Sequence, residues 1–312
     1  MKKRNRFGIF TLVLILSLCG CTQDKIPISS SSDVQKEQDT LPEAEITPEE
    51  EPFLYGYQNL NEEEKTRYRQ ILAGIENYED SVTVEVCSEE EINKVSNLVF
   101  VDHPEIFWLE QQNYSFNQKE NSDVDLLELN LVYNMGKDEI EDTKQQIEAK
   151  AEEWSQELSN CENEYDKIKY VYEFLGKNVL YDSESENNQN IQSVFLNQST
   201  VCMGFAKATQ YLLVRNGIFC TLVTGKVIPE NMEHAWNLVR IGENYYYVDT
   251  TWSSSGFVPE EDSMQDFSYT YLCCTAQTLE RSHVPDDNLT LPECKDDSYN
   301  YYKQNQSWYE SY

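Results

Sequence analysis

The fold of this chain is decided by three segments: VCMGFA at 201–206, HAWN at 234–237 and YYVDTTW at 246–252. Each segment contributes one reactive side chain, namely the Cys202 thiol, the His234 imidazole and the Asp249 carboxylate. A thiol served by an imidazole, which a carboxylate orients, is a recurrent arrangement in nucleophilic catalysis. Read singly, each residue is more often structural, as a buried cysteine, a satisfied core histidine or an ion-pair partner. Together they predict one nucleophilic site.

Cys202 lies where a helix is predicted to begin, directly after Gln198-Ser199-Thr200, a stretch able to cap it. The unsatisfied N–H groups and the positive dipole end of a helix N-terminus favour the thiolate form of a cysteine placed there. Gly204, in the first turn, is expected to leave room for a substrate backbone near the sulfur. The helix itself is indicated by an apolar stripe, Phe205, Ala208, Leu212 and Leu213, and by a terminating Asn216-Gly217.

The segments 234–241 and 245–251 are predicted to form a hairpin around the turn Gly242-Glu243. If Ile241 pairs with Asn244, His234 lies diagonal to Asp249 on the same face, about 7 to 8 Å away at the backbone and within side-chain reach. The carboxylate would then fix the ring tautomer, and the other ring nitrogen would serve the thiol as base and acid. A register slip of one residue would put Asp249 on the opposite face.

These motifs resemble those of the transglutaminase-like superfamily of papain-type cysteine enzymes, whose bacterial members carry a VCxGY/FA helix start, an HAWN strand and a VDxTW strand. The resemblance covers about Tyr165 to His283, with the order Cys, His, Asp. It implies an α+β papain-like core, in which a cysteine-bearing helix packs on an antiparallel sheet. It also implies acyl transfer through a thioester on Cys202, leading to protein cross-linking or to peptide or amide hydrolysis. The implied substrate is a protein or peptide, cell-wall peptide included.

One position departs from the family pattern. Members often have a tyrosine or similar polar group about ten residues before the cysteine, where this chain has Gln192. The Gln192 amide is a candidate oxyanion donor, and a surface or capping role is the alternative. The alternative to an enzyme is a catalytically silent adaptor of the same fold that binds a partner at the cell surface.

Residues 1–20 are predicted to be a lipoprotein signal peptide, with basic residues followed by the apolar run Ile9 to Leu18. Leu18 to Cys21 resembles a bacterial lipobox, which implies cleavage before Cys21 and a lipid on its sulfur. This anchor would hold the protein on the extracytoplasmic face of the cell membrane. An ordinary signal peptide with a free Cys21 is the alternative. Residues 21–52, rich in Ser, Glu, Asp and Pro, are predicted to be a disordered tether.

Two folded units are predicted after the tether. Residues 53–136 form a small α+β unit, with a helix capped by Asn61 and strands over 81–87 and 126–133. Within it, His103 to Trp108 is either a turn with a buried aromatic anchor or the lining of a binding cleft. Residues 137–312 form the transglutaminase-like domain, which opens with helices over 137–158 and 164–179.

Composition excludes several classes of function. The chain has 56 acidic and 24 basic residues, a formal net charge of −32, so nucleic acid would be repelled. We expect no cofactor, because no phosphate loop or CxxC pair occurs. A metal site is disfavoured because the chain has only three histidines, at 103, 234 and 283. Beyond Cys21, an odd number of cysteines indicates a free thiol and up to three disulfides of unassigned pairing: Cys87, Cys161, Cys202, Cys220, Cys273, Cys274 and Cys294.

Overall fold

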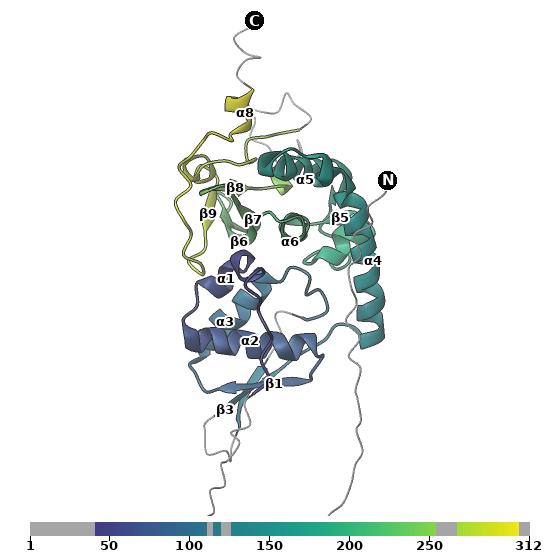
Figure 1. The fold of residues 1–312 in the computed structure, drawn as a ribbon, viewed down its shortest axis with the longest axis vertical. Coiled ribbons are helices and arrows are strands. Elements are labelled where there is room, and N and C mark those ends of the chain that lie inside the picture. The colour runs from purple at the N-terminus through teal and green to yellow at the C-terminus, as the bar shows by residue number, and fades with distance from the viewer. Residues whose placement is uncertain (1–40, 111–114, 120–125, 254–266, 306–312) are drawn as a thin grey trace, which may run out of the picture. The chain divides into compact units, whose positions relative to one another are not determined.

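The computed structural model describes residues 41–110, 115–119, 126–253 and 267–305 of the 312-residue chain. The chain from Leu41 onward forms one compact α+β unit, as Figure 1 shows. The predicted signal peptide (1–20), Cys21 and the first part of the predicted tether lie outside the described residues. Among the helices that are described, none is both long and apolar enough to cross a membrane.

The α-helices are α1 (Tyr55–Gln58), α2 (Glu62–Glu76), α3 (Glu89–Asp102), α4 (Lys137–Ser155), α5 (Glu164–Asn178), α6 (Cys202–Arg215), α7 (Ala276–Leu279) and α8 (Tyr301–Gln304). The strands are β1 (Ser81–Glu85), β2 (Ser115–Lys119), β3 (Leu126–Asn130), β4 (Leu180–Tyr181), β5 (Ser199–Thr200), β6 (Cys220–Val227), β7 (Met232–Ile241), β8 (Asn244–Val248) and β9 (His283–Pro285). Short helical turns are η1 (Glu51–Phe53), η2 (Gln156–Asn160), η3 (Ser193–Asn197) and η4 (Thr251–Ser253).

The N-terminal part combines helices α2 and α3 with a three-stranded antiparallel sheet in the order β1-β3-β2. The predicted Asn61 cap is confirmed, because Asn61 and Glu64 form a reciprocal capping box with backbone-to-side-chain bonds of 3.0 and 2.9 Å. The strand alternation of Val82 and Val84, both buried, is confirmed as well. Helix α3 was not predicted, although the Ser88 side chain accepts a hydrogen bond from the Glu91 N–H and so marks its beginning.

Residues 41–52 are packed, whereas the sequence predicted a disordered tether as far as residue 52. The Ala44 N–H donates to the Arg69 carbonyl at 2.9 Å, and the Arg69 guanidinium lies 2.7 Å from Glu43. Ala44 itself is buried. A low apolar content therefore did not prevent ordering here, because a backbone hydrogen bond and an ion pair to α2 hold the segment.

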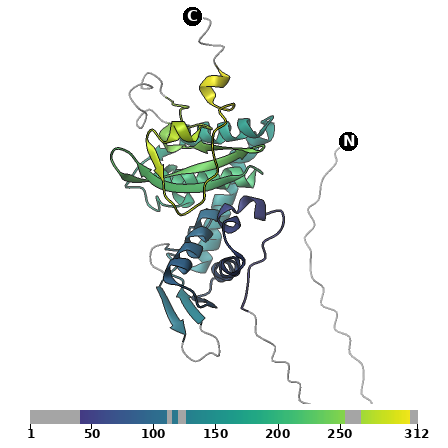
Figure 2. The same ribbon diagram turned by 90° about the vertical axis from the view of Figure 1, so that its left-hand side faces the viewer.

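The C-terminal part is built on a four-stranded antiparallel sheet in the order β8-β7-β6-β9. These strands are labelled in Figure 1, and Figure 2 shows the same ribbon turned by 90°. The predicted register is confirmed, since Ile241 pairs with Asn244 across the Gly242-Glu243 turn. Gly242 has a φ of +59°, which glycine adopts without a Cβ clash. Helix α6 packs on β6 and β7, so the predicted α+β fold with a cysteine-bearing helix on an antiparallel sheet is confirmed.

The two parts predicted as separate domains share one hydrophobic core. A buried hydrogen bond of 2.8 Å from Gln210 Nε2 on α6 to the Val101 carbonyl on α3 also joins them. Gly136, at the predicted domain boundary, is the N-cap of α4. The N-terminal part therefore supports the helix that carries Cys202 directly.

Candidate active site

Cys202 is the first residue of α6, as predicted. The N-cap is Val201, whose backbone is extended, and no side chain caps the helix. The expectation that Gln198-Ser199-Thr200 caps the helix is therefore wrong, because Thr200 Oγ1 instead donates to the Asn188 carbonyl at 2.9 Å. The first-turn N–H groups, which have no intrahelical acceptor, remain beside the sulfur. Their partial positive charge favours a thiolate at this position.

The space beside Gly204 is filled by the chain itself, by Thr200 and Asn188, and not left for a substrate. A Cβ on Gly204 would lie 1.9 Å from Thr200 Oγ1 and 3.1 Å from the Asn188 carbonyl oxygen. The expectation of a substrate backbone in this space is therefore wrong. Glycine instead lets the 188–200 segment wrap closely around the start of α6, which fixes the position of Cys202.

His234 and Asp249 come together through the hairpin register. His234 Nε2 lies 2.8 Å from Asp249 Oδ2, and both side chains are buried. The other carboxylate oxygen, Oδ1, accepts the N–H groups of Thr251 at 2.9 Å and Trp252 at 3.3 Å. Cys202 lies close enough to the His234 ring to contribute to its raised pKa. Since Nε2 is turned to Asp249, the ring offers Nδ1 to the thiol.

The protonation states follow from this arrangement. Burial by itself lowers the pKa of His234, but the adjacent Asp249 carboxylate and Cys202 raise that pKa to about 10. Burial by itself raises the pKa of Asp249, but the charge of His234 and the hydrogen bonds from His234 and His283 hold that pKa well below its ordinary value. The pair is therefore an imidazolium and a carboxylate at neutral pH.

Hydrogen bonds between the three motifs hold them in place. Asn237 Nδ2, from the HAWN segment, donates to the Ala206 carbonyl on α6 at 2.9 Å. Thr209 Oγ1 on α6 lies 2.9 Å from Thr250 Oγ1, next to Asp249. The polar residues around the triad thus align the helix with both strands, a role that sequence reasoning missed.

His283 is a site residue that the sequence analysis did not find. Its Nε2 lies 3.1 Å from Asp249 Oδ2, the same oxygen that His234 reaches. The side-chain donor atoms of His234, Asp249 and His283 all lie within 4.8 Å of one another, so this set could hold a metal ion. The separations of 2.8 and 3.1 Å are hydrogen-bond distances, and a zinc ion with bonds of about 2.0 to 2.2 Å would need the three groups to spread. The sequence offered little signal beyond the fact that His283 is one of only three histidines in the chain.

Gln192 and Cys21 stay predictions. Gln192 lies at the start of η3, and its Oε1 is buried without a hydrogen-bond partner. These contacts do not test whether the Gln192 amide nitrogen donates to an oxyanion. Cys21 lies outside the described residues.

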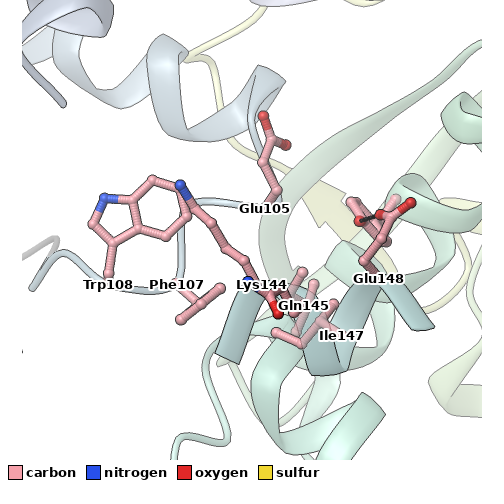
Figure 3. A pocket seen from close by; sticks show the side chains of 9 residues that line it. Glu105, Phe107, Trp108, Lys144, Gln145, Ile147 and Glu148 are labelled. Carbon is pink, nitrogen blue, oxygen red and sulfur yellow. Dashed lines mark hydrogen bonds between the residues drawn. The ribbon is translucent and has the colours of Figure 1, made fainter. Parts of the chain in front are cut away.

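His103 to Trp108 combines the two roles that the sequence left open. Trp108 is buried, as an anchor would be, and it also lines a cavity of about 310 Å³, shown in Figure 3. Lys144 extends over the Trp108 ring, with Nζ 3.9 Å from a ring centroid. His103 lines a second cavity, of about 430 Å³. The lining of neither cavity includes Cys202, His234 or Asp249.

The cysteines beyond Cys21 are all unpaired in the described part of the chain. Cys87 and Cys161 are partly exposed like Cys202, and burial is the main cause that raises the pKa of each. These two thiols are internal controls for any reagent that tests Cys202. The remaining four are buried: Cys220, Cys273, Cys274 and Cys294.

Comparison with known proteins agrees with this geometry. A protein-family model described as the transglutaminase-like superfamily matches residues 152–250, which include the three motif residues. The kyphoscoliosis peptidase of Mus musculus is 23% identical over 147 residues, which make up 42% of this chain and 22% of that protein. The chain therefore spans about a fifth of the length of this relative. A crystal structure of a TGase is 17% identical, covering 58% of this chain and 52% of that one, with a TM-score of 0.34. The periplasmic domain of TgpA from Pseudomonas aeruginosa is 12% identical, covering 55% and 68%, with a TM-score of 0.27. The transglutaminase-like match covers residues 152–250, which is about a third of the chain.

Proposed function

We propose, from the premise that residues 152–250 belong to the transglutaminase-like superfamily, that this protein is a cysteine enzyme that transfers acyl groups through a thioester on Cys202. One observation carries the proposal: Cys202 begins a helix beside the His234 ring, whose Nε2 lies 2.8 Å from the buried Asp249 carboxylate. This is the order of groups that nucleophilic acyl transfer requires.

The first half of the reaction forms the thioester. The Cys202 sulfur attacks the carbonyl carbon of an amide as a thiolate, and the oxyanion that forms faces the N–H groups at the start of α6, with Gln192 as a further candidate donor. His234 is protonated in the resting state, so it donates a proton to the departing nitrogen as the C–N bond breaks. Ammonia or an amine leaves, and His234 is then neutral.

The second half releases the acyl group. Neutral His234 takes a proton from water or from an incoming amine, which attacks the thioester carbon and displaces the sulfur. Water gives hydrolysis, and a lysine amine gives a cross-link. We propose a protein or peptide substrate, with cell-wall peptide as one candidate. The mouse relative is named a peptidase, which adds support to hydrolysis.

We also place the enzyme on the extracytoplasmic face of the membrane, held by lipid on Cys21. The support is the basic N-terminus followed by the apolar run that ends at Leu18 to Cys21. Mass spectrometry of the N-terminal peptide from membranes tests this placement. Diacylglycerol on Cys21 agrees with it, and an unmodified Cys21 contradicts it.

Thioester trapping tests the reaction itself. We expect the purified full-length protein, incubated with a glutamine-containing protein and a fluorescent primary amine, or with a peptide library, to produce a labelled or cleaved product. Brief acid quenching should leave an acyl adduct on the Cys202 peptide that mass spectrometry detects. The Cys202→Ala variant should yield neither product nor adduct, whereas Cys161→Ala should behave as the wild type. Equal turnover by wild type and Cys202→Ala would contradict the proposal.

A further inference from the structure

The Asp249 carboxylate is shared by two imidazoles. Its Oδ2 lies 2.8 Å from His234 Nε2 and 3.1 Å from His283 Nε2. A carboxylate oxygen only accepts hydrogen bonds, so each of these nitrogens carries a proton. With the two backbone N–H groups on Oδ1, the carboxylate receives four donors and has no freedom to rotate without losing some of them.

His283 is itself held from its far side. Its Nδ1 lies 2.8 Å from Ser282 Oγ, and that oxygen lies 2.7 Å from the Tyr271 hydroxyl. The Ser282 hydroxyl therefore links the His283 ring to Tyr271. A connected series of hydrogen bonds thus joins Tyr271, Ser282, His283, Asp249 and His234.

Three aromatic side chains surround the buried His283 ring and restrict its movement. The ring is 0% exposed, and its centroid lies 4.7 Å from Trp252, 5.0 Å from Trp236 and 5.1 Å from Tyr271. The titratable groups that face it are Asp249, His234 and Tyr271, and burial raises the pKa of the Tyr271 hydroxyl, which therefore stays neutral.

The backbone brings His283 to this position through a close strand contact. Strand β9 pairs with β6, which also pairs with β7, so Gly225 lies opposite both His234 and Pro285. A Cβ on Gly225 would lie 2.2 Å from the Val284 carbonyl oxygen and 2.6 Å from Trp236 Cη2. Glycine at 225 thus permits the close approach that places both histidines on one carboxylate.

We propose that His283 is a positioning residue of the acyl-transfer site: it fixes the Asp249 carboxylate so that this group orients His234 toward Cys202. The inference rests on the proposed function. His283 has no contact with Cys202 among the interactions of the described residues, and it acts only through Asp249. Its loss leaves Oδ2 with a single side-chain donor and frees the carboxylate to turn away from His234.

The test measures the rate of Cys202 alkylation by iodoacetamide from pH 5 to 9 in full-length His283→Leu and His283→Gln. Leucine removes the donor, whereas the glutamine amide can place an N–H where Nε2 stood. For His283→Leu we expect the rise in the Cys202 alkylation rate to occur at a pH about one unit higher than in the wild type. At a pH below that rise, the variant should then react about tenfold more slowly. His283→Gln should stay within about threefold of the wild type, since the donor is kept.

An unchanged profile in a folded His283→Leu would overturn the inference, as would equal losses in the leucine and glutamine variants, which would indicate packing alone. Histidine ¹⁵N NMR of the wild type keeps the inference testable if leucine prevents folding. A proton on His283 Nε2 at neutral pH agrees with it, and an unprotonated Nε2 overturns it. Ordinary reactivity of Cys202 in the wild type would instead overturn the proposed function, so the two failures are distinguishable.

Discussion

Replacing Asp249 with alanine is expected to lower the free energy of unfolding by about 3 to 5 kcal/mol at pH 7. The carboxylate is 0% exposed and accepts from His234, His283 and two backbone N–H groups. Its removal leaves these buried donors without an acceptor and the imidazolium without its counter-ion, and such losses are costly in a protein interior. Urea unfolding followed by circular dichroism measures the change.

Asp102 provides the matched control. It is a second buried carboxylate, remote in sequence, and it accepts from the backbone of Gly56 and Tyr57 at 2.7 Å each and from the Tyr68 hydroxyl at 3.0 Å. We expect Asp102→Ala to lower stability too, but to leave the alkylation of Cys202 unchanged. Asp249→Asn, which keeps the shape of the side chain, should slow alkylation. An Asp249→Ala protein as stable as the wild type would contradict this account of the site.

The contribution of His234 to stability is expected to fall as the pH rises. In the folded protein the pKa of His234 is raised to about 10, against about 6.5 in an unfolded chain. Its stabilising effect is therefore complete below pH 6.5 and is lost progressively as the pH approaches 10. Between pH 6.5 and 8.5 the loss is expected to be up to about 2 to 3 kcal/mol, at 1.36 kcal/mol per unit.

The measurement compares the free energy of unfolding of the wild type and His234→Ala across this range. Subtracting the unfolding free energies of the two proteins removes the effect of His103, which both contain. Burial lowers the pKa of His103, but the nearby Glu105 carboxylate outweighs this effect and raises that pKa. Stopping at pH 8.5 limits the effect of the buried thiols, which ionise in the unfolded chain at about that pH. A difference that does not change with pH would contradict a charged His234–Asp249 pair.

The central part of the site could be predicted because it depends on local rules. A two-residue turn at Gly242-Glu243 sets the hairpin register, and the register alone puts His234 and Asp249 on one face. The start of α6 at Cys202 follows from a helical apolar stripe and a terminating glycine. These are short-range signals, so a single sequence contains them.

The rest depends on contacts between distant segments. His283 reaches Asp249 only because β9 returns to pair with β6, and a strand of three residues leaves little periodic signal. Thr200 bonds to Asn188 and not to the helix end, and Ala44 is ordered by the Arg69 carbonyl. These partners could not be predicted from residue type, because each contact depends on how distant segments pack in the tertiary fold.

Alkylation of the wild-type protein tests the central claim most directly. The purified full-length chain is treated with iodoacetamide at pH 6, and mass spectrometry follows each thiol, with Cys87 and Cys161 as internal references. An ordinary thiol of pKa about 8.5 is almost entirely protonated at pH 6, so an imidazolium-paired Cys202 should react at least about tenfold faster than either reference. His234→Ala should remove that advantage. If Cys202 reacts no faster than Cys87 and Cys161, or ignores the loss of His234, the claim of an activated nucleophile is contradicted.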